Sequence, residues 1–234
     1  MLEEILKNGF SQMNLPFDSR MLERYRIYFD NLEETNKVMN LTAISGEEDV
    51  AKLHFLDCAA LLKSANLAGK KVIDVGTGAG FPGLALKIAC PDMKLVLLDS
   101  LDKRIGFLRE TCAKLELPDI EYLHARAEEA PKELRGSFDY AVARAVARLN
   151  LLCELCLPFV KTGGAFIAMK GPDCKEEVNE AKKGIALLGG KIEKCTVYTI
   201  PGTDVSHSLI IIRKIKATPE KYPRRWAQIK KQPL

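Results

Sequence analysis

The stretch DVGTGAGFPG, residues 74–83, follows the apolar run KKVI and precedes the helical pattern LALKIA. A strand, a glycine-rich turn and a helix in this order predict the first βα unit of a doubly wound sheet, whose ligands lie beyond the carboxyl ends of the strands. Glycine adopts positive φ readily and places no Cβ between the main chain and a ligand. We therefore expect a binding turn at Gly76, Gly78 and Gly80.

The spacing of these glycines separates the turn from two common nucleotide-binding motifs. It is G-x-G-x-G, whereas the dinucleotide fingerprint G-x-G-x-x-G requires a third glycine where Phe81 stands. No Gly-Lys-Ser/Thr follows, so a P-loop is excluded. The alternative is a tight structural turn that binds no ligand. Residues of the next βα unit distinguish the two interpretations.

Two acids narrow the choice of ligand. Asp99 ends the next apolar run, nineteen residues after Gly80, where an acid accepts hydrogen bonds from ribose hydroxyls. That position suits NAD and S-adenosylmethionine equally. Asp74, just before the turn, favours S-adenosylmethionine, because a carboxylate attracts its ammonium and sulfonium but repels a pyrophosphate. ARAEE (125–129) follows the third predicted strand, where an adenine would lie, and VARA (142–145) ends the fourth.

Seven short apolar runs predict the strands of one sheet. Helical patterns separate the first six runs, as in βα units. Only PGTDVS separates the last two, which is too short for a crossover helix and predicts an antiparallel hairpin. The expected fold is α/β: a doubly wound, seven-stranded, mostly parallel sheet of the class I methyltransferase type. The predicted strands are residues 70–75, 94–99, 120–124, 138–143, 164–170, 193–200 and 207–215.

Two flanking segments differ in texture from this domain, which we place at 69–215. Residues 1–68 contain helical patterns: one apolar face repeats from Leu22 to Leu32, and Ser45 with Glu48 fits a capping box. Residues 216–234 carry three prolines, six basic residues and one acid. This composition predicts a basic tail that is extended, or that orders on binding a partner.

The overall composition is that of an ordinary globular protein, with 234 residues, 47% hydrophobic and 28% charged. A net charge of +4 is too small to identify a nucleic-acid partner by itself. No run approaches about 20 apolar residues and the N-terminus lacks a basic region, so we expect neither a membrane span nor a signal peptide. Seven scattered cysteines favour free thiols in a reducing cytoplasm. No dimerisation seam is evident, and we expect a monomer.

Several motifs resemble the RsmG (GidB) family of bacterial ribosomal RNA methyltransferases. The resemblance covers residues 36 to 170 and extends to the ending PEKYPRR, as in longer members of the family. Cys58 stands where that family has serine in an H-x-x-D-S element. The motifs are DVGTGAGFPG, LLDSLDKRIGFL, ARAEE, ARAVARL and AMKG, with NKVMNLTAI and HFLDC upstream.

The resemblance implies methyl transfer from S-adenosylmethionine to N7 of a guanosine in the 530-loop of 16S rRNA, as naked RNA or within the small ribosomal subunit. Guanine N7 carries a lone pair and no proton, so the reaction needs alignment rather than a general base. The sequence also lacks the Asn/Asp-Pro-Pro-aromatic element of amine methylases and a Pro-Cys nucleophile after the fourth strand. By position, the family's cofactor contacts fall on Gly76, Phe81, Ala127, Glu128 and Arg144, and Asp99 takes the ribose position.

Basic residues near the predicted strand ends are candidates for RNA binding. Lys103 and Arg104 begin a helix, where the dipole disfavours cations, which suggests a phosphate partner. In the tail, Trp226 lies among cations and suits base stacking, or else it packs against the domain. The remaining candidates are Arg126, Arg148, Lys170, Arg224 and Arg225, while Arg144 could contact cofactor, RNA or Glu128.

Other residues favour structural roles. Cys153 and Cys156 have zinc-like spacing but no second pair, so we expect core thiols and no metal site. His54 and Asp57 share a helix face and are expected to form a hydrogen-bonded pair, with a substrate-side role as the alternative. Two other functions stay open: methylation of a small molecule, and RNA binding in ribosome assembly without turnover.

Overall fold

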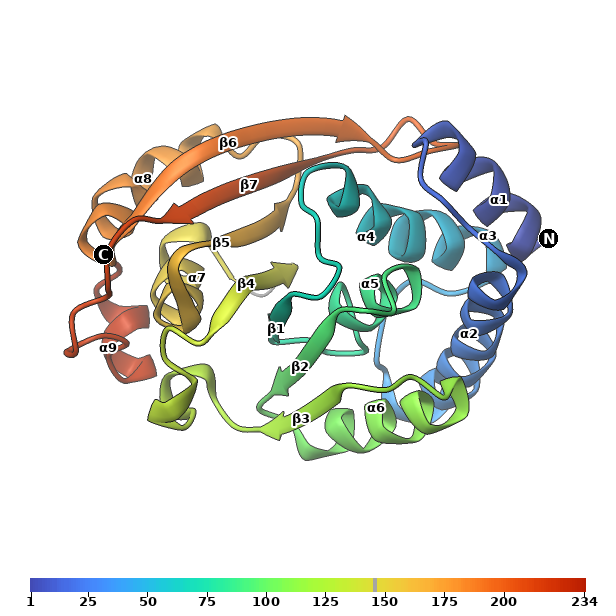
Figure 1. Ribbon diagram of the computed structural model, residues 1–234, viewed down its shortest axis with the longest axis horizontal. Helices are drawn as coiled ribbons and strands as arrows, with labels where there is room; N and C mark the ends of the chain where they lie inside the picture. The colour runs from blue at the N-terminus through green and yellow to red at the C-terminus, as the bar shows by residue number, and fades with distance from the viewer. Residues whose placement is uncertain (145–146) are drawn as a thin grey trace.

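A single seven-stranded sheet organises the chain (Figure 1). The computed structural model describes residues 1–144 and 147–234. The strand order is β3-β2-β1-β4-β5-β7-β6, and the neighbours from β3 to β5 are parallel. The strands are β1 (Lys71–Val75), β2 (Lys94–Asp99), β3 (Ile120–His124), β4 (Phe138–Arg144), β5 (Val160–Lys170), β6 (Gly190–Thr199) and β7 (Ser206–Lys214).

The topology confirms the predicted fold. β7 pairs antiparallel with both β5 and β6, so the last two strands form the expected hairpin. Strand order reverses between β1 and β4, and a doubly wound sheet opens its ligand crevice beyond the strands at such a point. The glycine turn follows β1, so the turn stands at this crevice.

Helices cover both faces of the sheet. One face carries the N-terminal helices together with α5 and α6, and the other carries α7, α8 and α9. Between β3 and β4 the predicted helical pattern is wrong: Pro131 and Gly136 interrupt that stretch, and only two short 3₁₀ turns form. The elements of the domain and tail are α5 (Gly83–Ala89), α6 (Asp102–Leu115), η3 (Ala127–Glu129), η4 (Lys132–Leu134), α7 (Leu149–Cys156), η5 (Leu157–Phe159), α8 (Lys175–Leu187) and α9 (Trp226–Lys231).

The N-terminal segment is helical, as predicted, and shares its core with the domain. The face from Leu22 to Leu32 is buried, and the Tyr25 hydroxyl donates to the Ala85 carbonyl at 2.8 Å. The predicted capping box does not form, because the helix begins at Glu47, whose carboxylate pairs with Arg26 at 2.6 Å. The elements are α1 (Leu2–Gln12), α2 (Ser19–Met39), α3 (Glu47–Asp49), the π-helical η1 (Val50–Leu56), α4 (Asp57–Ala59) and the 3₁₀ turn η2 (Ala60–Lys63).

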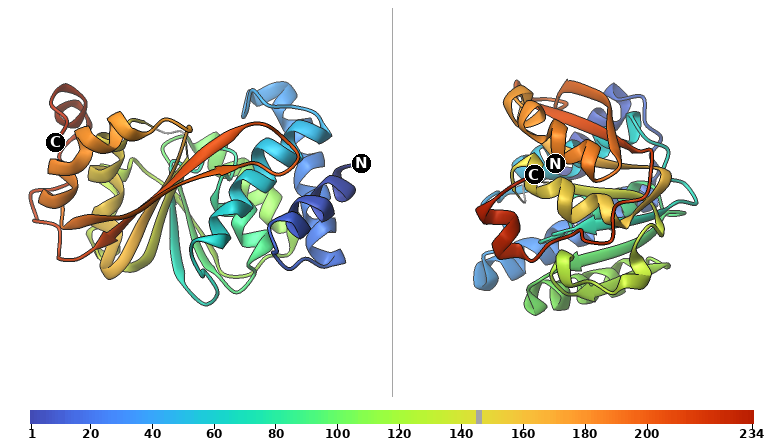
Figure 2. Two further views of the ribbon diagram at one scale, coloured as in Figure 1. Left: turned by 90° about the horizontal axis from the view of Figure 1, so that it is seen from above. Right: turned by 90° about the vertical axis from the view of Figure 1, so that its left-hand side faces the viewer.

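The long β6–β7 hairpin links the two ends of the molecule. Figure 2 shows it crossing from α8 to the N-terminal helices. At its tip Ile200 is fully buried in the core that these helices share, and Gly202 lies beside Lys52 of η1. The hairpin therefore brings β6 and β7 side chains next to the helix that carries His54 and Asp57.

The C-terminal segment is not extended, contrary to our prediction. It folds back on the domain and ends in α9, beside α7 and α8 (Figure 1). Tyr222 and Ile229 are buried among apolar residues of α7 and the sheet, and the Arg135 guanidinium donates to the carbonyls of Tyr222 and Thr218. Two spaced apolar anchors thus order a segment whose charge alone suggested disorder.

Among the described residues, no helix has the length and apolar character needed to span a bilayer.

Candidate functional site

The glycine turn has the backbone that the sequence predicts. Gly76, Gly78 and Gly80 have φ of +73°, +60° and +103°. A Cβ on Gly78 would meet no atom within 4 Å, so the main chain there is open to a ligand. A Cβ on Gly80 would lie 2.5 Å from the Tyr28 hydroxyl oxygen. Gly80 is therefore required for packing against α2, and not for ligand approach.

Asp99 ties the end of β2 to this turn. Its side chain is 2% exposed; Oδ2 accepts from the Gly78 N–H at 2.9 Å, and Oδ1 accepts from the Leu101 N–H at 2.9 Å. Arg104 pairs with Oδ2 at 3.4 Å. The pair accounts for a cation in the first turn of α6 without a phosphate partner.

A pocket opens beside Asp99 between the ends of β1 and β2, the turn after β3, α7 and α9. Four of the eight predicted cofactor residues line it, namely Gly76, Asp99, Ala127 and Glu128. The sequence did not assign the remaining lining residues to a cofactor. They are Val75, Leu98, Ser100, Ala125, Arg126, Leu155 and Trp226.

Phe81 and Arg144 lie outside this pocket. Phe81 is 6% exposed and stacks on the His54 ring at a centroid distance of 4.1 Å. The Arg144 guanidinium lies 4.9 Å from the centre of the Phe81 ring, a cation–π contact. Arg144 does not pair with Glu128 in this structure. Ala145, the last residue of VARA, and Val146 lie outside the described residues.

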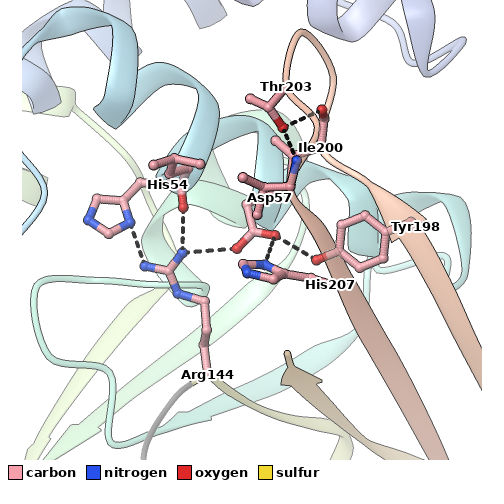
Figure 3. Close-up of polar contacts among 9 residues, drawn as sticks. His54, Asp57, Arg144, Tyr198, Ile200, Thr203 and His207 are labelled. Carbon is pink, nitrogen blue, oxygen red and sulfur yellow. Dashed lines mark hydrogen bonds and ion pairs between the residues drawn. The ribbon is translucent and has the colours of Figure 1, made fainter. Parts of the chain in front are cut away.

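Arg144 is the centre of a buried polar network (Figure 3). It donates to His54 Nδ1 at 2.7 Å, to the Leu53 carbonyl at 3.0 Å and to Asp57 Oδ2 at 3.1 Å. The acceptors come from η1 and the start of α4. The Leu53 carbonyl lies within the π-helical turn η1, where the backbone departs from the regular i−4 ladder.

Asp57 joins this network to the hairpin. Its Oδ1 accepts from the Tyr198 hydroxyl at 2.6 Å and from His207 Nδ1 at 2.8 Å (Figure 3). Burial alone would raise the pKa of Asp57, but these two hydrogen bonds and the charge of Arg144 hold the pKa below its usual value. No pattern in the sequence pointed to Tyr198 or His207, because their partner lies about 140 or more residues away and only the fold brings them together.

His54 and Asp57 do not bond to each other, so the predicted pair is wrong; both bond to Arg144 instead. Nε2 of His54 lies 2.8 Å from the Thr42 hydroxyl, in the NLT motif. Burial, reinforced by the charge of Arg144, lowers the pKa of His54 to about 3. The imidazole is therefore neutral: Nδ1 accepts from Arg144 and Nε2–H donates to Thr42.

Asp74 is fully buried beneath the glycine turn. Its Oδ2 accepts from the Thr77 hydroxyl at 2.6 Å and from the Gly83 N–H at 2.7 Å. Its Oδ1 is buried and has no hydrogen-bond partner among the described residues. Burial raises the pKa of Asp74 to about 7. A partly satisfied acid under an open glycine turn fits a ligand that brings positive charge, as S-adenosylmethionine does.

Comparison with known proteins identifies the family. Residues 21–203 match the family GidB, described as rRNA small subunit methyltransferase G. The chain belongs to this family. It is 48% identical over 233 residues to Ribosomal RNA small subunit methyltransferase G of Alkaliphilus metalliredigens (strain QYMF), and also 48% identical over 233 residues to that of Clostridium botulinum (strain Loch Maree / Type A3). In both comparisons, 98% of each chain is covered.

Solved structures support the fold independently of this family. The tRNA methyltransferase TrmI of Aquifex aeolicus superposes with a TM-score of 0.56 at 14% identity, covering 69% of each chain. TYW2 of P. horikoshii, in complex with MeSAdo, gives a TM-score of 0.56 at 16% identity over 72% of this chain and 67% of that chain. The family's class I methyltransferase fold is thus established for this chain.

The predicted RNA-binding residues divide into two groups. Four pair with carboxylates of the chain: Arg104 with Asp99, Arg148 with Glu180, Lys170 with Glu177 and Arg224 with Glu154. The other three are exposed and have no ion pair within the described part of the chain, and they are Lys103, Arg126 and Arg225.

Three cysteines near the predicted motifs are core thiols. Cys153 and Cys156 belong to α7 and are fully buried in the core, as predicted. Cys58, at the family's serine position, is also buried, and burial raises the pKa of its thiol to about 12. Within residues 1–144 and 147–234, no three His, Cys, Asp or Glu side chains are grouped as a metal site would require.

Proposed function

We propose that this chain transfers the methyl group of S-adenosylmethionine to N7 of a guanosine in the 530-loop of 16S rRNA. Membership of the rRNA small subunit methyltransferase G family carries this proposal. The choice of N7 and of the loop rests on the motif resemblance. A site drawn from one chain is compatible with a monomer, which stays our prediction.

The pocket beside Asp99 supports the cofactor half of the proposal. An acid at the end of β2 is placed to accept both ribose hydroxyls. Gly76 lines the pocket, and the open main chain at Gly78 admits the rest of the ligand. Ala127 and Glu128 form the side where the adenine lies. Gly80, Phe81 and Arg144 act as support, since their side chains or missing Cβ atoms face the N-terminal helices.

The chemistry asks little of the protein beyond alignment. When bound, S-adenosylmethionine supplies an electrophilic methyl group on a sulfonium. The N7 lone pair forms the new N–C bond, the C–S bond breaks, and S-adenosylhomocysteine leaves without any proton transfer. The neutral His54 and the fully engaged Asp57 accordingly hold the fold of the site, and neither is needed as a base.

The unpaired cations support the RNA half. Lys103, Arg126 and Arg225 lie on three segments that meet near the pocket: α6, the turn after β3 and the segment before α9. Neutralising phosphates releases counterions, so such residues contribute to affinity without reading sequence. We place the RNA backbone along these three cations. We do not place RNA contacts at Arg148, Lys170 and Arg224, because each of them pairs with a carboxylate of the protein.

A methyl-transfer assay tests the proposal directly. Purified protein is incubated with labelled S-adenosylmethionine and small ribosomal particles from a strain that lacks this gene, and the modified nucleotide is mapped. We expect label at guanine N7 within the 530-loop. Asp99→Asn should abolish transfer, whereas Asp30→Asn, an exposed acid of α2, should leave it unchanged.

The outcomes separate the parts of the proposal. Label on another nucleotide would support RNA methyltransferase activity but refute the guanosine of the 530-loop as its target. If the protein binds the cofactor but labels no ribosomal particle, the assignment of 16S rRNA as its substrate is refuted. A steep fall of RNA affinity with salt, reduced in Lys103→Ala or Arg126→Ala, supports the placement of the RNA, and an unchanged salt slope contradicts it.

A further inference from the structure

Trp226 is the aromatic side chain that lines the pocket beside Asp99. It begins α9, which the sequence places far from every motif of the methyltransferase domain. The other walls are short aliphatic side chains, polar groups and main chain. An adenine has two flat faces, and stacking on an aromatic ring stabilises a bound base. Among the described residues that line the pocket, Trp226 alone offers an aromatic ring for this contact, and it comes from the C-terminal segment.

The segment that carries Trp226 is held firmly at the neighbouring residue. Arg224 donates from its main-chain N–H and from Nε to Oε1 of Glu154, at 2.8 and 2.9 Å. Its Nη2 donates to Oε2 of Glu154 at 2.6 Å. Glu154 lies on α7 and is fully buried, and Arg224 is partly buried, so the pair is bidentate with a desolvated carboxylate. Truncating either partner would leave the other charge unpaired.

Further anchors stand on both sides of the tryptophan. The buried ring of Tyr222 precedes it and the buried side chain of Ile229 follows it in α9, both in the core that includes α7. Arg135 binds the carbonyl of Tyr222. Trp226 itself is half-buried and packs on the same core. The indole is thus positioned before any ligand arrives, which lowers the entropy cost of a stacking contact.

We propose that Trp226 forms the adenine wall of the cofactor site, so that the C-terminal segment completes the S-adenosylmethionine pocket. This inference rests on the proposed function, because it assigns that pocket to the methyl donor. It gives the segment a role at the cofactor in addition to the RNA contact expected from its charge. Trp226 acts by positioning the ligand and takes no part in the bond changes.

The chain contains a single tryptophan, which makes the test direct. S-adenosylhomocysteine is titrated into the full-length protein, and binding is followed by calorimetry and by tryptophan fluorescence. Stacking on adenine should quench the emission, with a midpoint that matches the calorimetric dissociation constant. Adenosine should quench as well, whereas homocysteine should not, because it lacks the base.

Three variants distinguish the ring from the docking of the segment. Trp226→Ala should weaken S-adenosylhomocysteine binding about tenfold, since it removes a stacking contact. Trp226→Phe should restore most of the affinity. Ile229→Ala is the matched control: it loosens α9 from the core without removing a pocket side chain, so it should weaken binding less than Trp226→Ala. Thermal unfolding of each variant verifies that it is folded.

Each remaining outcome overturns a defined statement. Unchanged affinity in Trp226→Ala, with no quenching in the wild type, refutes the adenine wall and leaves the proposed function standing. Tighter binding in Trp226→Ala would mean that the indole obstructs the pocket, which also refutes it. Equal losses in Trp226→Ala and Ile229→Ala would assign the effect to docking alone. If the wild-type protein binds neither S-adenosylmethionine nor S-adenosylhomocysteine, the proposed function itself fails.

Discussion

Asp57 and Asp74 are both fully buried carboxylates near the carboxyl edge of the sheet, yet their surroundings differ in one respect. Asp57 is saturated: Arg144, Tyr198 and His207 all reach it, and its pKa lies below the usual value. Asp74 receives two donors on one oxygen and none on the other, and burial raises its pKa to about 7. The protein itself supplies hydrogen-bond partners to both oxygens of Asp57, whereas Oδ1 of Asp74 has none among the described residues.

The origin of the donors explains the contrast. The partners of Asp57 come from β4 and from the hairpin, so the carboxylate fastens three distant parts of the chain. The partners of Asp74 are Thr77 and Gly83, within the same turn. A buried charge with long-range partners is structural, whereas a partly satisfied charge beneath an open binding turn is expected to respond to a ligand.

The largest effect is expected from Asp57→Asn. The substitution leaves the largely buried Arg144 guanidinium without its anionic partner, and breaking a buried pair on one side costs about 3 kcal/mol or more. We expect the free energy of unfolding, measured in urea at pH 7, to fall by that amount. The control is Glu48→Gln, which breaks the solvent-exposed pair with Lys52 and should leave the free energy of unfolding almost unchanged. Equal losses in the two variants would contradict the structural role of Asp57.

Asp74→Asn should have the opposite effect, and one that depends on pH. Because the folded pKa lies above the unfolded value of about 3.9, folding binds a proton and the wild type loses stability as pH rises from about 4 through about 7. Asparagine imitates the protonated acid at every pH. Relative to the wild type, the variant should gain about 2 to 3 kcal/mol between pH 5 and pH 8. A constant difference across urea titrations at these two pH values would show that Asp74 is ionised throughout.

Tyr198→Phe tests one donor of the saturated site. It removes the 2.6 Å hydrogen bond to Oδ1 of Asp57 and leaves His207 and Arg144 in place. A hydrogen bond to a charged acceptor contributes about 1.5 kcal/mol or somewhat more. Denaturant unfolding should show a loss of that size. In the background of Asp57→Asn the same change should cost less, since the charged acceptor is gone, and additive losses would argue against the contact.

The unsaturated site should also affect cofactor affinity. S-adenosylmethionine brings positive charge, which favours the ionised form of Asp74, so binding should tighten as pH rises through about 7. One pH unit below its pKa, a carboxyl is about one-tenth ionised, so affinity should fall about tenfold at pH 6 relative to pH 8. Calorimetry on wild type and Asp74→Asn isolates this contribution from the titration of the ligand's own amino group. Parallel pH profiles for the two proteins would contradict the prediction.

The smallest effect is expected from His207→Gln. The hydrogen bond to Asp57 raises the pKa of His207, so the charged imidazole stabilises the fold fully below its unfolded pKa of about 6.5 and loses this effect as pH rises through the folded pKa. Because His207 is partly exposed, the substitution should lower the free energy of unfolding by under about 1 kcal/mol at pH 5.5. By pH 9 the difference in unfolding free energy should have shrunk. A difference that grows with pH would be inconsistent with a protonated His207.

Much of the domain could be read from local pattern. Alternation of short apolar runs with helical stretches predicted all seven strands and the hairpin, since period and turn length are local properties. The helical pattern between β3 and β4 failed because Pro131 and Gly136 interrupt it. The tail failed for the opposite reason: charge and proline suggested disorder, while Tyr222 and Ile229 find an apolar surface that only the folded domain provides.

The sequence by itself determined the glycine turn, the acid at the end of β2 and the family, because each depends on residue type at short spacing. The tertiary structure decided how those residues are used. It turned Gly80, Phe81 and Arg144 toward the N-terminal helices, and it brought Tyr198 and His207 to Asp57. It also placed Trp226 in the pocket beside Asp99. Contacts between residues far apart in the chain form only when the sheet and its flanking helices share one core. Short-range sequence patterns therefore cannot predict these contacts.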